Sequence, residues 1–338
     1  MRKRTITRIL ILCFITFASI TGIAQDMHFS QFYHSPLLTN PANTGVFSGR
    51  YRISTNYKNQ WQSVTNPYKT VFAGIDFSTP SKKLGIGFSV FNDKAGKSRM
   101  GITQGNLYLS YNLRINGSNR FITGLQYGVG QKSMRINDLM WDSQFNGVAY
   151  DPSVASGEAQ YSESYTYMDV SAGMMWNYTA SHSASRFKNS VGVAVFHANQ
   201  PQQSFDGNEK LYYKIVAHLN NQFKLSESPV YILPQVLYSM QGPYKEINAG
   251  ALVKFVIGNE QGDLIRSNRI DKRYSSPAAY IGGQFRYKDA FIAMAAFEFK
   301  KGLLLSISYD VNVSKLHVAS GLKGGTEFAL IYRGFFAR

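Results

Sequence analysis

The stretch "KLGIGFSVF" (residues 83–91) decides the fold, because its large apolar side chains occur at every second position. Leu84, Ile86, Phe88 and Val90 form one face, and the residues between them are glycine or serine. A period of two places successive side chains on opposite faces of an extended chain. The stretch therefore predicts a β-strand with one apolar face and one face of small or polar side chains.

The same alternation recurs along the chain, for instance in "TVFAGIDFS" (70–78) and "GLLLSISYDVN" (302–312). Counting such segments gives about fourteen strands, an even number, as in bacterial single-chain membrane barrels. The predicted strands are 50–59, 68–78, 83–92, 102–115, 120–132, 164–177, 188–198, 211–224, 229–240, 246–258, 277–287, 289–299, 302–312 and 325–333.

Strand length and the second face separate a membrane barrel from a soluble β-sandwich or propeller. Strands of a sandwich usually have about five or six residues, whereas about ten are needed to cross a bilayer at a tilt. Most of the predicted strands reach that length, and their second face is rich in Gly, Ser, Asn and Gln, as a polar lumen is. The sequence therefore predicts an all-β protein: a single transmembrane antiparallel β-barrel over residues 50–338.

Residues 1–24 are predicted to be a secretory signal peptide that is cleaved before Gln25. "MRKRTITR" is basic, the following "ILILCFITFASITGIA" is apolar, and the run ends in small residues. The alternative is a retained anchor helix, but the apolar run is short of the roughly 20 residues that a spanning helix needs. Export places the barrel in the outer membrane. Removal of the signal also removes Cys13, so the mature chain has no disulfide chemistry.

The charge of the chain bears on its partners. It has 36 Lys and Arg against 20 Asp and Glu, and the signal holds four of the basic residues, which leaves 32 − 20 = +12. These side chains are spread out, without a recognition helix or zinc spacing, so no nucleic-acid partner is predicted. The tightest basic cluster is either a solvated loop or a periplasmic docking patch. Its residues are Arg266, Arg269, Lys272 and Arg273.

The connections suggest an orientation. If both termini are periplasmic, the connections from odd to even strands face outward, and the longest of them, residues 133–163, lies outside as long loops do. The turns "STPSKK" and "NGSN" fall on the periplasmic side, where short turns belong. Residues 259–276 are an exception, because they form a long connection on that side.

Residues 25–49 precede the first strand and lack a clean period. Pro36 and Pro41 prevent a long helix, and Asn40 before a proline favours extended backbone. Two interpretations remain open for this N-terminal segment. It either folds into the lumen as a plug, with its polar groups paired to the barrel wall, or forms an unstructured lead-in.

No enzyme, cofactor or metal site is predicted. "GIG" and "GVG" are strand glycines rather than phosphate-binding loops, and no G-x-S-x-G occurs. Asp138, Asp142 and Asp151 lack the glycine and terminal glutamate of an EF-hand calcium loop. The histidines are scattered without a pair at ligand spacing. They are His28, His34, His182, His197, His218 and His317.

Six short motifs occur in order along the chain: "NPANTG" (40–45), "NQW" (59–61), "LGIGFSVFND" (84–93), "YKDAFIAM" (287–294), "LSISYDVNVSKL" (305–316) and "GGTEFALIY" (324–332). Together they resemble the PorP/SprF family of outer-membrane proteins of the Bacteroidota type IX secretion system. The resemblance covers nearly the whole chain after the signal. Residues that match the family motifs are Asn40, Pro41, Ala42, Trp61, Tyr309, Asp310, Asn312, Ser314, Lys315 and Leu316. Asp310 and Asn312 either hydrogen-bond a plug or shape the turn that follows.

The resemblance implies a role in secretion rather than catalysis. Family members help to export, or hold at the cell surface, client proteins with a C-terminal targeting domain, typically large adhesins that include those used in gliding motility. It also implies contact with other type IX components and with periplasmic proteins linked to peptidoglycan. The main alternative is a FadL-like or porin-like channel for small or hydrophobic solutes, since a fourteen-stranded barrel with an N-terminal hatch suits both.

Overall fold

The computed structural model describes residues 26–60, 67–96, 100–135, 139, 141–156, 164–180, 187–202, 205, 210–226, 228–258, 276–300, 302–314 and 321–336. In these parts of the chain, fourteen antiparallel strands form one sheet. They are β1 (Tyr51–Gln60), β2 (Tyr68–Ser78), β3 (Leu84–Ala95), β4 (Met100–Arg114), β5 (Asn119–Ser133), β6 (Ser164–Thr179), β7 (Phe187–Phe196), β8 (Lys214–Lys224), β9 (Val230–Gln241), β10 (Tyr244–Val256), β11 (Ala278–Arg286), β12 (Ala290–Glu298), β13 (Leu303–Asn312) and β14 (Lys323–Gly334).

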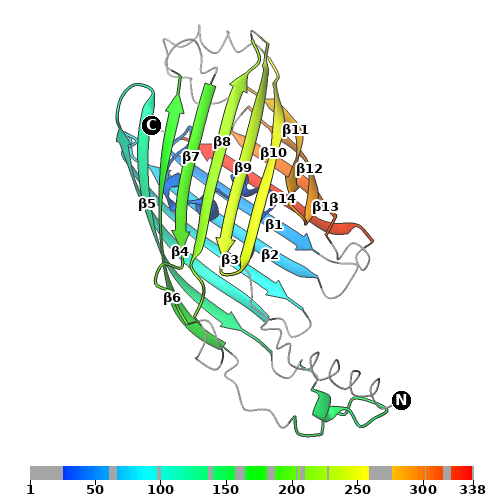
Figure 1. Cartoon of the computed structure of the whole chain (residues 1–338). Coiled ribbons are helices and arrows are strands. Elements are labelled where there is room, and N and C mark those ends of the chain that lie inside the picture. Colours follow the sequence, from blue (N-terminus) through cyan, green and yellow to red (C-terminus); the bar gives the residue numbers. More distant parts are fainter. Residues whose placement is uncertain are drawn as a thin grey trace, which may run out of the picture.

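The sheet closes into a barrel (Figure 1). Each strand pairs with its neighbours in sequence, and β1 pairs with β14 from Tyr51 opposite Gly334 to Gln60 opposite Gly325. Closure leaves no unpaired edge along the wall, which is the condition for a sheet to span lipid. The predicted fourteen-stranded barrel is confirmed, and every predicted strand end lies within three residues of the observed one.

The two faces of the wall follow the alternation in the sequence. In β3, Leu84, Ile86, Phe88 and Val90 point outward, and the Phe88 side chain is 48% exposed in the isolated barrel. The residues between them, Gly85 among them, face the lumen and are buried. The outer face is therefore an apolar surface that lipid covers, as the period of two predicts.

The two ends of the barrel differ in the connections that they carry. The terminal end is where β1 begins and β14 ends, and the loop end carries the odd-to-even connections, including the long one between β5 and β6 (Figure 1). The β10–β11 connection lies at the terminal end. Predicted features that fall outside the described residues are the signal (1–24), Trp61, Lys315, Leu316 and the patch Arg266, Arg269, Lys272 and Arg273.

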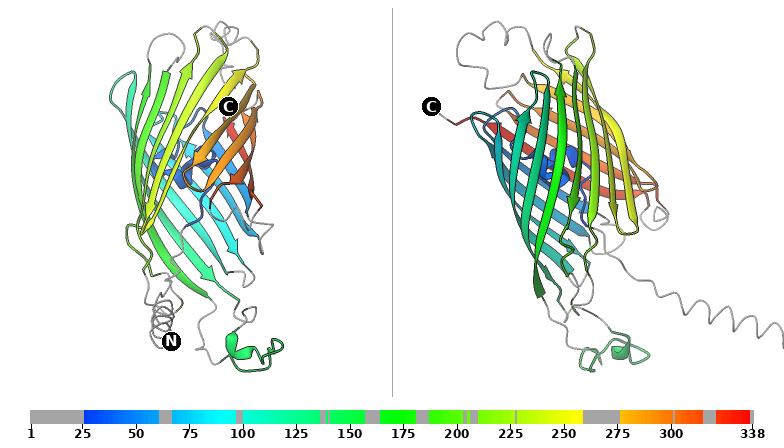
Figure 2. Two further views of the ribbon diagram at one scale, coloured as in Figure 1. Left: turned by 45° about the vertical axis from the view of Figure 1, so that its right-hand side comes forward. Right: turned by 60° about the vertical axis from the view of Figure 1, so that its left-hand side comes forward.

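The lumen contains the described part of the N-terminal segment, residues 26–49, drawn in dark blue within the barrel (Figure 2). It forms three short helices, η1 (Phe32–His34), α2 (Pro36–Thr39) and η2 (Pro41–Asn43). None of the helices in the described chain is long and apolar enough to span a membrane.

Candidate functional site

Prolines set the local structure of the N-terminal segment. Pro36 and Pro41 stand at the first positions of α2 and η2, where their missing N–H group is not needed. Asn40 between the two helices is extended, with φ −163° and ψ 126°, as expected before a proline. Its Oδ1 atom accepts a hydrogen bond of 2.9 Å from Ala42 N and so caps η2.

Asn40 also joins the segment to the barrel wall. Its side chain is fully buried. Nδ2 donates to the carbonyl oxygens of Met174 in β6 (3.1 Å) and Val193 in β7 (3.2 Å), and it lies 3.2 Å from His218 Nε2 in β8. In the "NPA" motif, the amide oxygen of Asn40 thus binds the segment and the amide nitrogen binds the wall.

Glycines in the wall make room for this motif. A Cβ atom on Gly173 would stand 2.1 Å from Asn40 Oδ1, and one on Gly124 would stand 2.4 Å from Ala42 N. On Gly192 it would stand 2.8 Å from Asn40 Nδ2. Such distances are far below van der Waals contact, so residues 40–42 can approach the wall only because β5, β6 and β7 carry glycine at these points.

Ser30 and Gln31, on the side of the segment that faces β14, bind a buried carboxylate. Glu327 in β14 accepts hydrogen bonds from the backbone N–H groups of Ser30 (2.7 Å) and Gln31 (3.1 Å), and its own carbonyl accepts from Gln31 Nε2 (3.2 Å). The Gln31 side chain also contacts Ser306 in β13. These N–H groups would otherwise be buried without partners, which is costly.

A cluster of charged side chains surrounds Ser30. Its hydroxyl donates to Asp310 Oδ2 in β13 (2.7 Å), and the same carboxylate oxygen accepts from Arg286 Nη2 in β11 (2.8 Å). Lys58 of β1 lies 3.9 Å from this oxygen and donates to the carbonyl oxygen of His28 (3.1 Å). The buried charges are therefore paired, and Ser30 is part of the pairing.

A second ion pair holds the C-terminal part of the segment. Arg52 of β1 and Asp76 of β2 form two hydrogen bonds of 2.9 and 2.8 Å. Asp76 also accepts from Gly45 N (2.7 Å), and Arg52 Nη2 donates to the carbonyl oxygen of Asn43 (3.1 Å). This pair lies toward the terminal end of the barrel, next to the point where the N-terminal segment joins β1.

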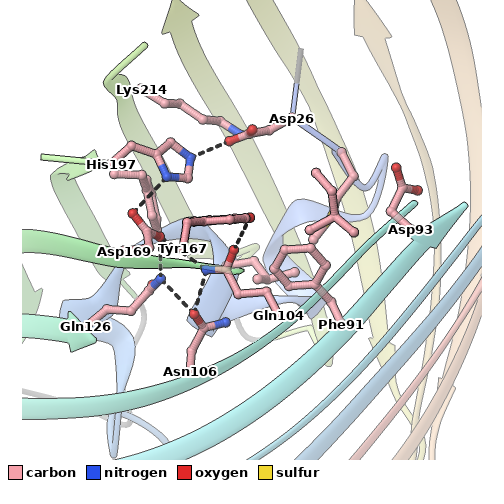
Figure 3. Close-up of a pocket in the computed structure, with 14 residues that line it drawn as sticks. Asp26, Phe91, Asp93, Gln104, Asn106, Gln126, Tyr167, Asp169, His197 and Lys214 are labelled. Carbon is pink, nitrogen blue, oxygen red and sulfur yellow. Dashed lines mark hydrogen bonds and ion pairs between the residues drawn. The ribbon is translucent and has the colours of Figure 1, made fainter. Parts of the chain in front are cut away.

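The other end of the segment is fixed near the loop end (Figure 3). Asp26 Oδ2 lies 2.6 Å from His197 Nε2 and 3.8 Å from Lys214 Nζ, and His197 Nδ1 lies 2.9 Å from Asp169 Oδ1 in β6. Burial would lower the pKa of the His197 imidazole, but the two carboxylates outweigh burial and raise this pKa to about 9. His197 therefore links the segment to the wall as a cation.

A cavity of about 80 Å³ lies next to this link and is lined in part by Gln104, Asn106, Gln126 and Tyr167. Tyr167 donates to Gln104 Oε1 (2.9 Å), and both Gln104 and Gln126 donate to Asn106 Oδ1 (2.8 and 3.1 Å; Figure 3). These polar groups can bind water molecules, for which the cavity has room.

Apolar contacts complete the packing of the segment. Phe29 and Leu37 pack on Phe72 and Tyr108 on one side of the lumen. On the other side, Phe32 packs in a cluster with residues of β7, β8 and β9, namely Ala194, Phe196, Val216 and Leu237. Each large apolar side chain buried in this way contributes about 1.5–3 kcal/mol.

The residues of the predicted C-terminal motif have different surroundings in the structure. Asp310 faces the lumen and accepts a hydrogen bond from Ser30. Asn312 instead accepts from Ser314 N (2.9 Å) and Ser314 Oγ (2.7 Å) and so shapes the turn after β13. Tyr309 points outward and is exposed. The motif therefore combines a lumen contact, a turn and a lipid-facing side chain.

Sequence reasoning missed Glu327, Arg52, Asp76 and the role of the histidines. The four histidines in the described residues all lie in or against the N-terminal segment: His28, His34, His197 and His218. The available signal was polarity, since Glu327 and Asp76 are charged residues on the lumen face of otherwise apolar strands. In the described part of the chain no cluster of His, Cys, Asp or Glu is arranged to hold a metal ion.

Comparison with solved structures finds other barrels at low identity. A Pseudomonas aeruginosa FadL homologue is 10% identical, with 88% of this chain and 93% of that chain covered and a TM-score of 0.46. BamA from Haemophilus ducreyi lacking POTRA domains 1–3 is 10% identical (84% and 70% covered, TM-score 0.41), and Acinetobacter baumannii Omp33 is 6% identical (84% and 98%, TM-score 0.40). These likenesses carry no argument about function. No curated protein matches the sequence.

The closed wall with its apolar outer face and polar lumen defines an integral outer-membrane β-barrel protein. The model of one family, described as type IX secretion system membrane protein PorP/SprF, matches residues 21–332. The chain belongs to the PorP/SprF family of outer-membrane proteins of the type IX secretion system, as the sequence motifs indicate.

Proposed function

We propose that the protein is a non-enzymatic outer-membrane component of the type IX secretion system that aids the secretion or surface attachment of client proteins. The clients bear a C-terminal targeting domain, and large surface adhesins are the expected type. The observation that carries this proposal is the lumen segment, residues 26–49, which is bound to β1, β2, β6, β7, β13 and β14 by buried and partly buried hydrogen bonds. A barrel whose lumen is filled in this way binds its partners at the membrane and does not transport them through the lumen.

The same packing argues against a channel. The segment brings Phe29, Phe32 and Leu37 against apolar side chains on two sides of the lumen. Opening the lumen would expose these side chains and break the contacts of Glu327 and Asp310 with Ser30. A porin-like channel needs an open path for solutes through the lumen, so we assign the segment the role of a plug that stays in position.

Orientation in the membrane follows from the connections. With the terminal end in the periplasm, the loop end and residues 133–163 face the outside, where they meet the client. Asp26 lies at the loop end and the chain enters β1 at the terminal end. The N-terminal segment therefore runs through the lumen from its outer to its inner end after the signal, residues 1–24, is removed.

The terminal end then faces the periplasmic machinery. The long β10–β11 connection carries Arg266, Arg269, Lys272 and Arg273, a basic cluster on the side where peptidoglycan-linked proteins of the type IX system lie. We assign this patch as the contact for an acidic periplasmic partner. A variant with all four residues changed to serine should lose that partner and keep the client.

The test is a mild-detergent purification of the tagged protein from outer membranes, with mass spectrometry of what accompanies it. Recovery of a large surface protein with a C-terminal targeting domain, together with type IX components, is the expected result. The same purification from cells that lack the secretion machinery is the control. If the barrel is free of partners in both preparations and conducts ions in a planar bilayer, the proposal is wrong and the protein is a channel.

A further inference from the structure

The β5–β6 connection contains a compact unit, residues 141–156, that projects beyond the loop end (Figures 1 and 2). Its centre is Gln144, the last residue of the short helix η4 (Asp142–Gln144), and this residue is buried. Gln144 Oε1 accepts from Trp141 N (3.3 Å) and Tyr150 OH (3.2 Å), and its Nε2 donates to the carbonyl oxygen of Val154 (2.9 Å). One side chain thus joins both ends and the middle of the unit.

Backbone contacts reinforce the unit. Asp151 N donates to the carbonyl oxygen of Gln144 (2.8 Å), and Phe145 and Tyr150 form an antiparallel bridge. Asn146 closes the tip, because its Oδ1 accepts from Val148 N (3.0 Å) and Ala149 N (2.8 Å). The tip is therefore held in one conformation before any partner arrives, which lowers the entropic cost of binding.

This ordered tip presents apolar side chains to solvent. Val148 is 90% exposed and Phe145 is 57% exposed. Both belong to the unit 141–156 in the connection between β5 and β6, which projects beyond the strand ends (Figure 1). A preformed loop that holds a valine and a phenylalanine outward fits an apolar pocket on another macromolecule, since such anchors carry much of the binding energy in protein interfaces.

The charge of the connection indicates what surrounds that pocket. Residues 136–163 contain five acidic side chains and no basic one, in a chain with a net charge of +16. The acidic residues are Asp138, Asp142, Asp151, Glu158 and Glu163. Basic residues on the partner complement this charge. A second copy that met this one through the same connection would bring the same acidic side chains, and an anionic lipid surface would also repel it.

We propose that the unit 141–156 is a docking element for the secreted client, which presents an apolar pocket edged with lysine and arginine. Val148 and Phe145 enter the pocket, and Asp142 and Asp151 of the unit pair with its edge. This inference rests on the proposed function, because it assigns the client to one loop of the barrel.

The probe is a photo-crosslinking amino acid placed at position 148 of the full-length protein, with the cross-linked peptides identified by mass spectrometry. Cross-links to a basic, apolar region of a protein with a C-terminal targeting domain are expected. The yield of these cross-links should fall as the salt concentration is raised. Cross-links only to a second copy of the chain or to lipid would overturn the assignment.

Variants make the test independent of the cross-linker. Val148→Arg, and the pair Phe145→Ser with Val148→Ser, should reduce recovery of the client about tenfold or more, the scale of losing central apolar anchors. Tyr213→Ser, an exposed aromatic outside the unit, is the matched control. Barrel assembly is checked by heat-dependent mobility on gels.

The outcomes separate the two proposals. If the wild-type protein recovers the client and the Val148 variants recover it equally well, the docking element is wrong and the secretion role stands. If the wild-type protein recovers no client, the proposed function fails with it.

Discussion

Asn40 and Gly173 are 133 positions apart in sequence, yet a Cβ atom on Gly173 would stand 2.1 Å from Asn40 Oδ1. The N-terminal segment and the wall therefore fit at this point without room for a methyl group. Because Asn40 also donates to the carbonyl oxygens of Met174 and Val193, a small displacement would break several buried hydrogen bonds together.

Gly173→Ala is expected to destabilise the folded protein by about 1–3 kcal/mol, the usual cost of overpacking a tight interior. Urea titration in detergent, followed by heat-dependent mobility on gels, measures the change. Gly105→Ala is the control, because a Cβ there meets its nearest atom at 4.0 Å. Equal stability of the two variants would show that the segment does not press on the wall at Gly173.

Glu327→Ala is expected to loosen the start of the segment, because Ser30 and Gln31 would lose the acceptor of their N–H groups. Each buried group left without a partner costs about 1–3 kcal/mol. Hydrogen exchange of these two amides, read by mass spectrometry, should accelerate strongly. Asp151→Ala changes a carboxylate that hydrogen-bonds Ser153 in the connection between β5 and β6 and does not contact Ser30 or Gln31, so it should leave these amides protected.

Phe88→Arg tests the outer face of the wall. A charge on the lipid face near the membrane midplane costs about 2–4 kcal/mol, and less near an interface. Barrel assembly and outer-membrane yield should fall for this variant. Ser81→Arg, in the exposed turn between β2 and β3, should assemble normally. A wild-type yield for Phe88→Arg would contradict the assignment of Phe88 to lipid.

The link between Asp26 and His197 predicts a pH dependence. The pKa of His197 is about 9 in the folded protein, above its ordinary value of 6.5, so the protonated form is the one that folding favours. The stabilisation is fully present below pH 6.5 and is lost as the pH rises through about 9. Proteolysis of the segment near Asp26 should therefore increase between pH 8 and 10. His197→Gln should remove most of this dependence, because Lys214, which also faces Asp26, is unchanged in that variant.

Alternation predicted the wall well, because a lipid-facing strand must repeat its apolar residues with a period of two. Phe88 and Leu305 alternate with Ser89 and Ser306, and this pattern depends only on neighbours in sequence. Strand ends were predicted within three residues for the same reason.

The contacts of the lumen segment could not be predicted in this way. Gly124, Gly173 and Gly192 resemble other small residues on the polar face, and only barrel closure brings them to Asn40 and Ala42. His197 and His218 looked isolated because residues that meet across a lumen share no spacing in sequence. Asp310 was singled out by its motif, and its partner Ser30 was not.

The most direct test of a closed lumen is the conductance of the wild-type barrel and of a variant without residues 25–45 in planar bilayers. The segment closes the lumen in this account, so the wild-type protein should be silent and the shortened variant should open a stable pore. Heat-dependent mobility on gels shows that both barrels are folded. A wild-type barrel that conducts, with a conductance that the deletion does not change, would contradict the account.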